Sequence, residues 1–191
     1  MRIAKTLLCM AVVAFIVALS TMQRSTQGST LQRKFKHEAK IRAQYDEASN
    51  KTVVAMWPYV VESNYNDPAE SIAITAGITF PNKSQTSPPQ YVEFGVLSQS
   101  SSGWLFDKDR KLEVIVNSES LPLGEMKLVT ARTFNTRRLY YREDLAIPLP
   151  YDVLVKIVSS DKVVMRVGRQ KLQLRKEHLE ALRDLVSRIS A

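Results

Sequence analysis

The sequence predicts a mainly β protein: an antiparallel β-sandwich, immunoglobulin-like in a loose sense, with a C-terminal amphipathic α-helix. Three observations support this fold class. From Thr52 onward the chain consists of short runs in which apolar and polar residues alternate, as in half-buried strands. Turn-forming residues separate these runs, and no βα rhythm indicates a parallel sheet. The one strongly helical pattern ends the chain, whose 191 residues suit a single domain.

The clearest strand is Ser71–Phe80, with the sequence SIAITAGITF. Apolar residues recur at every second position, and alternate residues of a strand point to the same face. We therefore expect one face of this strand to lie in the core: Ile72, Ile74, Ala76, Ile78 and Phe80.

Two strand pieces, Thr52–Met56 and Tyr59–Ser63, precede the clearest strand. Pro58 interrupts them, and because proline donates no backbone hydrogen bond, the break suits an edge strand or a bulge. Tyr91–Ser98 is the next strand after Phe80, and Gly95 within it is expected to mark a bulge.

The remaining strands are short and bounded by turn residues. Pro148 and Pro150 are expected to mark an irregular connection, and residues 168–171 to form the turn of a hairpin. The expected extended segments are Trp104–Phe106, Leu112–Val116, Glu125–Thr133, Arg138–Ala146, Leu154–Ser159, Val163–Val167 and Leu172–Leu174.

The C-terminal helix is predicted at about residues 176–189. Apolar residues recur there at helical spacing, and oppositely charged pairs three and four positions apart support a helix. We expect the apolar stripe to pack against the sheet: Leu179, Leu182, either Leu185 or Val186, and Ile189.

The N-terminus has the three-part layout of a secretory signal peptide, predicted at residues 1–20. Arg2 and Lys5 precede the apolar run Leu7–Leu19, and small and polar residues follow. The alternative is an uncleaved membrane anchor over residues 6–23, since that stretch is uncharged and approaches the length of a bilayer span. We expect an extracytoplasmic protein, periplasmic or secreted, with membrane anchoring as the alternative.

A polar and basic linker or arm is expected at residues 21–48. Its second part, Arg33–Ala48, fits a weak helix or an extended arm equally well. The β-sandwich domain with its terminal helix is expected to occupy residues 49–191.

Three segments of the chain carry a resemblance: YDEASNKTVV, WLFDKDRKLEVIVNSE and VVMRVGRQKLQLRKEHLEALRDL. They resemble a group of uncharacterised secreted bacterial proteins with a signal peptide, a β-rich domain and a C-terminal helix. In that group a strand pair with the pattern V-x-V-G-x-x-x-F-x-L leads into a helix with the pattern L-x-x-L-R. The corresponding residues are Val163, Val167, Gly168, Leu172, Leu174, Leu179, Leu182 and Arg183. The resemblance covers most of residues 45–187 and implies export and a fold, but no activity.

The composition argues against several kinds of site. With two histidines and one cysteine, metal centres and disulfide scaffolds are nearly excluded. The six glycines do not cluster into a phosphate-binding loop. We expect no cofactor and no metal.

No catalytic motif is present, and no catalytic residue is predicted. His178 is expected to be a surface residue of the terminal helix rather than a general base. The nearest carboxylate pairs, Asp107 with Asp109 and Glu143 with Asp144, lie among lysines and arginines and are expected at charged hairpin tips. We therefore expect that the protein is not an enzyme.

Residues 132–142, RTFNTRRLYYR, interleave arginine with aromatic residues, a composition able to bind anions. Trp57 and Trp104 are candidate aromatic contacts. The chain has a formal net charge of +8, which favours an anionic cell-envelope polymer, lipid headgroups or another envelope protein as partner. Specific nucleic-acid binding is not expected. The predicted anion- or partner-binding residues are Arg132, Arg137, Arg138 and Arg142.

The function that the sequence favours is a non-enzymatic extracytoplasmic binding or structural module. Two alternatives remain open. One is a membrane-anchored assembly module, and the other is a hydrolase of unrecognised type, for which His178 and Asp107 are the residues to test.

Overall fold

The computed structural model describes residues 35–64, 66–83, 87–135 and 138–189. These residues belong to one compact unit that begins at Phe35. The expected signal peptide, the alternative anchor, the linker as far as residue 34, and Arg137 lie outside the described residues.

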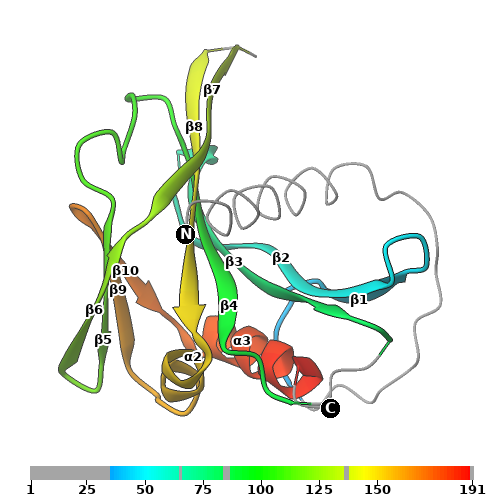
Figure 1. The fold of residues 1–191 in the computed structure, drawn as a ribbon. Coiled ribbons are helices and arrows are strands. Elements are labelled where there is room, and N and C mark those ends of the chain that lie inside the picture. Colours follow the sequence, from blue (N-terminus) through cyan, green and yellow to red (C-terminus); the bar gives the residue numbers. More distant parts are fainter. Residues whose placement is uncertain (1–34, 65, 84–86, 136–137, 190–191) are drawn as a thin grey trace, which may run out of the picture. The chain divides into compact units, whose positions relative to one another are not determined.

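The fold is mainly β, with two antiparallel sheets and a C-terminal helix, as predicted. The larger sheet has six strands in the order β1-β2-β3-β4-β8-β7, and the smaller has four in the order β10-β9-β5-β6. Figure 1 shows α2 and α3 near the end of β8 that leads into α2, at the opposite end of the sheets from where β7 ends and β8 begins. The elements are β1 (Ile41–Asp46), β2 (Lys51–Asn64), β3 (Asp67–Pro81), β4 (Tyr91–Ser100), β5 (Lys111–Val116), β6 (Glu119–Glu125), β7 (Lys127–Asn135), β8 (Leu139–Pro150), α2 (Tyr151–Val158), β9 (Val163–Val167), β10 (Gln170–Leu174) and α3 (Lys176–Ile189).

The core is a single cluster to which the inner faces of both sheets and the apolar sides of α2 and α3 contribute. In β3 the expected inner residues are buried, apart from Phe80, which is partly exposed. In the small sheet every second residue of β5, β9 and β10 is buried in the same way. The alternation therefore sets which side of each sheet faces the core.

Gly95 does not mark a bulge, because β3 and β4 pair there without a register shift. A side chain would meet a neighbouring strand instead: a Cβ at Gly95 would lie 2.7 Å from Cγ2 of Thr75, its partner in the register. The glycine permits close packing on this face of the sheet.

The two strand pieces around Pro58 form one continuous strand, β2. Its register with β3 shifts between Met56 and Tyr59, which confirms the bulge expected from the proline. The backbone N–H of Trp57 donates to Lys40 O at 2.8 Å, so the described end of the arm lies along β2. Of the two forms expected for the arm, the described part adopts the extended one, since it leads into β1.

Pro148 and Pro150 do not interrupt the chain, because β8 continues to Pro150. The pairing of β7 with β8 ends at Ala146, whereas β4 pairs with β8 as far as Pro150. Beyond Ala146, β8 has an open side that tolerates a residue without an N–H group.

The strand expected at Leu154–Ser159 is instead the helix α2, so this prediction is wrong. Its β-branched residues are typical of strands. However, burial follows helical spacing, with Leu154, Ile157 and Val158 inside. Proline readily precedes a helix, and Pro150 stands in an extended conformation at the N-cap.

The helix predicted at the C-terminus is confirmed as α3. Its apolar stripe is buried, with Leu185 inside and Val186 only partly buried. Its Arg183 donates through Nε to Val158 O at 2.6 Å and through Nη2 to Ser160 O at 3.0 Å. Arg183 thus provides donors for the last carbonyl of α2 and for that of Ser160, two residues beyond the helix.

We expect Leu185→Ala to lower the free energy of unfolding by about 2–5 kcal/mol, because the truncation leaves a cavity among close-packed side chains. Leu185 is 0% exposed. Urea unfolding at unchanged m-value measures the loss. The control Val155→Ala, on the exposed side of α2, is expected to change stability by less than about 0.5 kcal/mol. Similar losses for both variants would contradict the assignment of the core.

Candidate functional site

The 101–110 loop, between β4 and β5, is fixed by a buried carboxylate. Glu143 of β8 is 2% exposed. Its Oε2 accepts hydrogen bonds from the N–H groups of Leu105 at 2.6 Å and Phe106 at 3.0 Å. Ser98 Oγ donates to the same oxygen at 3.4 Å. Amide donors of this kind are what a buried carboxylate requires, so the ion and the loop stabilise each other.

A second carboxylate holds the start of this loop. Glu70 of β3 accepts hydrogen bonds from the N–H of Ser101 at 2.9 Å, from the hydroxyl of Ser101, and from Nδ2 of Asn64 at 2.7 Å. The hydroxyl of Ser101, followed by the Asn64 amide, lowers the pKa of the Glu70 carboxyl from 4.5 to about 2. The loop is therefore attached to both β3 and β8.

The end of the 101–110 loop packs on the turn between β9 and β10. Two requirements favour glycine at position 168. A Cβ there would overlap Asp109 O, and the φ of +54° is a backbone conformation that other residues rarely adopt. Arg110 Nε donates to Phe106 O at 3.0 Å within the loop. The strand predicted at Trp104–Phe106 is absent, because side chains and not a neighbouring strand satisfy its backbone.

The fixed loop presents a tryptophan. Trp104 is 37% exposed, and its ring meets the ring of Tyr141 edge to face, with centroids 5.0 Å apart. Phe106, two residues later, is fully buried in the core. Trp104 is thus held between two fixed points while a third of its surface faces solvent.

Two of the predicted arginines have carboxylate partners. Arg142 Nε lies 2.9 Å from Oδ1 of Asp144, which is buried. Arg138 Nη1 lies 3.2 Å from Oδ2 of Asp67, which also accepts a hydrogen bond from the Tyr140 hydroxyl at 2.9 Å. The first pair could be predicted from the sequence, because residues two apart on a strand share a face. The second pair could not, because Arg138 and Asp67 are far apart in the chain.

Arg132 differs from these two, since it has no carboxylate partner among the described residues. It is exposed on β7 and stands opposite Arg142 in the register with β8. The next pair on the same face, Phe134 and Tyr140, stacks with centroids 5.5 Å apart. Arg132 is therefore an exposed cation, with no carboxylate partner among the described residues, on a hairpin whose strands pair in a defined register.

The β7–β8 hairpin has two unlike faces. Opposite residues in an antiparallel pair share a face, and successive residues alternate. One face carries arginines and a stacked aromatic pair, and the other carries Tyr141, Leu139 and the neighbouring Trp104. Figure 1 shows β7 and β8 extending together past the neighbouring strands of the sheet. We call the following residues the hairpin surface: Trp104, Arg132, Phe134, Arg138, Leu139 and Tyr141.

Trp57 does not belong to the hairpin surface. It lies on β2, which β3 and β4 separate from β8. The guanidinium of Arg42 lies 5.2 Å from the centroid of the Trp57 ring. The structure therefore does not bring the two predicted aromatic contacts together.

His178 is not the surface residue that we predicted, since it is 1% exposed. Its Nδ1 accepts a hydrogen bond from the N–H of Arg175 at 3.0 Å, and its Nε2 lies 3.1 Å from Val60 O. These partners define the neutral tautomer with the proton on Nε2. The imidazole thus reaches back to the N-cap of α3, as the third residue of a capping box does. Both nitrogens have structural roles.

Three of the four carboxylates weighed for catalysis have hydrogen-bond or ion-pair partners, and the fourth, Asp107, is exposed on the 101–110 loop. Glu143 and Asp144 are buried within β8 rather than placed at a hairpin tip, and they point to opposite faces. Asp109 Oδ1 accepts from the N–H of Lys111 at 3.1 Å, which closes a local turn. Among the described residues, no three His, Cys, Asp or Glu side chains are grouped to hold a metal ion.

No family model, curated protein or solved structure matches this chain. No helix in the described residues is long and apolar enough to span a bilayer. The fold and the hairpin surface define a mainly β protein with two antiparallel sheets and an exposed aromatic and cationic edge.

We expect Glu143→Gln to lower the free energy of unfolding by about 1–3 kcal/mol, because the amide group loses the charge that the loop N–H groups stabilise. In a Trp57→Phe background, Trp104 emission should shift to the red and become more accessible to acrylamide. The control is Glu125→Gln at an exposed carboxylate. Equal stability and equal emission for the two variants would show that Glu143 does not fix the loop.

The structure also predicts a pH dependence. Burial, the largest cause, lowers the pKa of His178 from 6.5; Glu177 opposes the shift, and Arg175 adds to it. As the pH decreases, the unfolded state binds a proton at His178 at a higher pH than the folded state does. The free energy of unfolding should therefore fall as the pH decreases below 6.5. His178→Gln keeps a side chain that caps α3 without titrating. The difference in unfolding free energy between wild type and variant should change between neutral and mildly acidic pH, and a constant difference would refute the prediction.

Proposed function

We propose that this chain is a non-enzymatic binding module whose hairpin surface recognises a carboxylate-rich polypeptide. The observation that carries the proposal is an exposed tryptophan on a loop held by a buried carboxylate, beside a hairpin whose Arg132 has no carboxylate partner in the described part of the chain. Tryptophan, tyrosine and arginine are the residues that most often dominate binding energy at interfaces. A fixed loop also reduces the entropy lost on binding.

The buried carboxylates and the imidazole of His178 already have hydrogen-bond or ion-pair partners, which supports a binding role rather than a catalytic one. Glu143 is surrounded by amide donors, Asp144 is paired with Arg142, and both nitrogens of His178 are taken. A general base needs a free acceptor within reach of a substrate. None of these groups offers one.

We propose an extracytoplasmic location for this module. The support is the sequence of the N-terminus, where Arg2 and Lys5 precede the apolar run Leu7–Leu19. The chain's formal net charge is +8, and it stays positive without Arg2 and Lys5, so the module would attract acidic partners there.

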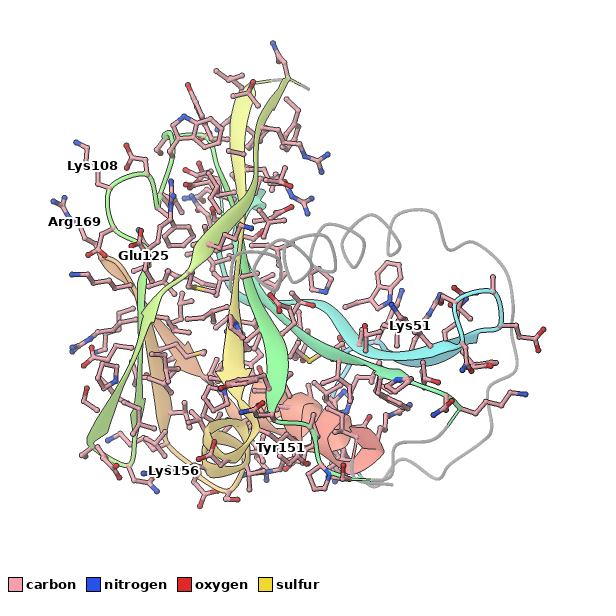
Figure 2. All side chains as sticks on the ribbon, viewed as in Figure 1. Lys51, Lys108, Glu125, Tyr151, Lys156 and Arg169 are labelled. Atoms are coloured by element: carbon pink, nitrogen blue, oxygen red, sulfur yellow. The ribbon has the colours of Figure 1, made fainter. Side chains whose placement is uncertain are left out.

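Binding to immobilised poly-L-glutamate tests the function. We expect Arg132→Glu to weaken binding about tenfold and Trp104→Ala to weaken it severalfold. Arg169→Glu changes the net charge by the same amount at an exposed turn between β9 and β10 (Figure 2), so it is the matched control and should have less than about a twofold effect.

Equal losses for the two charge reversals would show that net charge alone drives binding, and the proposal would fail. Phosphatidylglycerol vesicles provide a second probe. If they bind more tightly than polyglutamate with the same dependence on Arg132, the partner is a lipid surface and not a polypeptide.

A further inference from the structure

The strand β7 is an open edge of the larger sheet. In the part of the chain that the structure describes, it pairs only with β8. It has nine residues, no proline, and one register shift between Leu128 and Thr130. Beyond that shift, residues 131–133 are all exposed. Every second residue of such an edge directs its N–H and C=O groups outward, where another strand can pair with them.

Strand β6, the edge of the smaller sheet next to β5, is less able than β7 to pair with an added strand. Proline lacks the N–H that an added strand needs, and β6 contains Pro122 close to a register shift with β5. Strands β1 and β10 are edges as well, but they have only six and five residues; β1 is the opposite edge of the larger sheet, and β10 is an edge of the smaller sheet. Among the described edges, β7 is therefore the longest without proline.

The two faces of the hairpin meet at the β7 edge. Arg132 points to one face, whereas Thr133 shares the other face with Tyr141, against which Trp104 packs. A strand added to β7 would alternate its own side chains between the same two faces. One set would lie beside Arg132, and the other would extend the apolar face.

We propose that the β7 edge receives an extended segment of a partner polypeptide as an added strand, in which acidic and apolar residues alternate. The acidic side chains face Arg132, and the apolar side chains lie on the face of Thr133 and Tyr141. This proposal rests on the proposed function and specifies the partner of the same surface. Backbone hydrogen bonds supply affinity in this mode of recognition, and alternate side chains supply specificity.

A second copy of this chain is a poor occupant of the edge. Strand β7, KLVTARTFN, has no aspartate or glutamate, so another β7 brings no carboxylate to Arg132. Charge complementarity therefore favours a different, acidic polypeptide.

The test uses the wild-type protein and three synthetic octapeptides, which avoids variants that fail to fold. The first is VEVEVEVE, the second is VKVKVKVK, and the third is the first with every peptide nitrogen methylated, so that neither edge of the peptide keeps an amide donor. N-methylation preserves the charges but removes the amide donors that pair with an edge strand. Binding is followed by NMR shifts and by the exchange rates of the backbone amides of β7.

We expect VEVEVEVE to bind weakly, with a dissociation constant of about 1 mM or less, and to slow exchange at alternate residues of β7. The lysine peptide and the methylated peptide should bind at least about tenfold more weakly. Arg132→Glu should reverse the preference between the acidic and basic peptides, whereas Arg169→Glu should not.

Three results would overturn strand addition: no binding by VEVEVEVE at millimolar concentration, equal binding by its methylated form, or protection confined to β1 or β10. If polyglutamate binding still depends on Arg132 in those cases, the proposed function stands and only strand addition fails. If neither polyglutamate nor VEVEVEVE binding depends on Arg132, the proposed function fails together with strand addition.

Discussion

The buried carboxylate of Glu143 is the interaction on which the arrangement of the two sheets depends. It belongs to β8 in the larger sheet, and it binds the backbone of the loop that leads into β5 of the smaller sheet. Phe106 enters the core directly after these hydrogen bonds. A buried charge of this kind is stable only while its donors remain in place. Together with Glu70, which holds the start of the loop, Glu143 therefore ties the loop, and with it the start of the smaller sheet, to the larger sheet.

The sequence predicts those elements whose patterns are local. Strand β3 and helix α3 show their own periodicities, and the bulge near Pro58 follows from a missing N–H group. Helix α2 was missed because β-branched residues favour strands locally, whereas packing of Leu154 and Ile157 against the core requires a helix. Burial of His178 and Glu143 was missed because their partners are backbone groups far away in sequence, such as Val60 O.

The candidate site was predicted by composition but not by arrangement. The run of arginines and aromatic residues lies on the β7–β8 hairpin, and Trp104 is exposed beside it. The sequence does not indicate that Arg138 has a carboxylate partner and Arg132 has none among the described residues, because the partner of Arg138, Asp67, comes from another strand of the sheet. The binding role of these residues remains a prediction. What the structure adds is the separation of the charged and apolar groups onto opposite faces that meet at one edge.

The contact between α3 and β2 has a consequence for how the chain folds during synthesis. His178 and Val60 are 118 positions apart, and β5 pairs with β9 across another long separation. Contacts of this kind slow folding, because a long loop must close before they form. Until α3 has been synthesised and has left the ribosome, it cannot pack against β2 and β3, and the apolar side of these strands is not covered by it. Folding of the two sheets around their shared core is thereby delayed until α3 has been synthesised and can pack against β2 and β3.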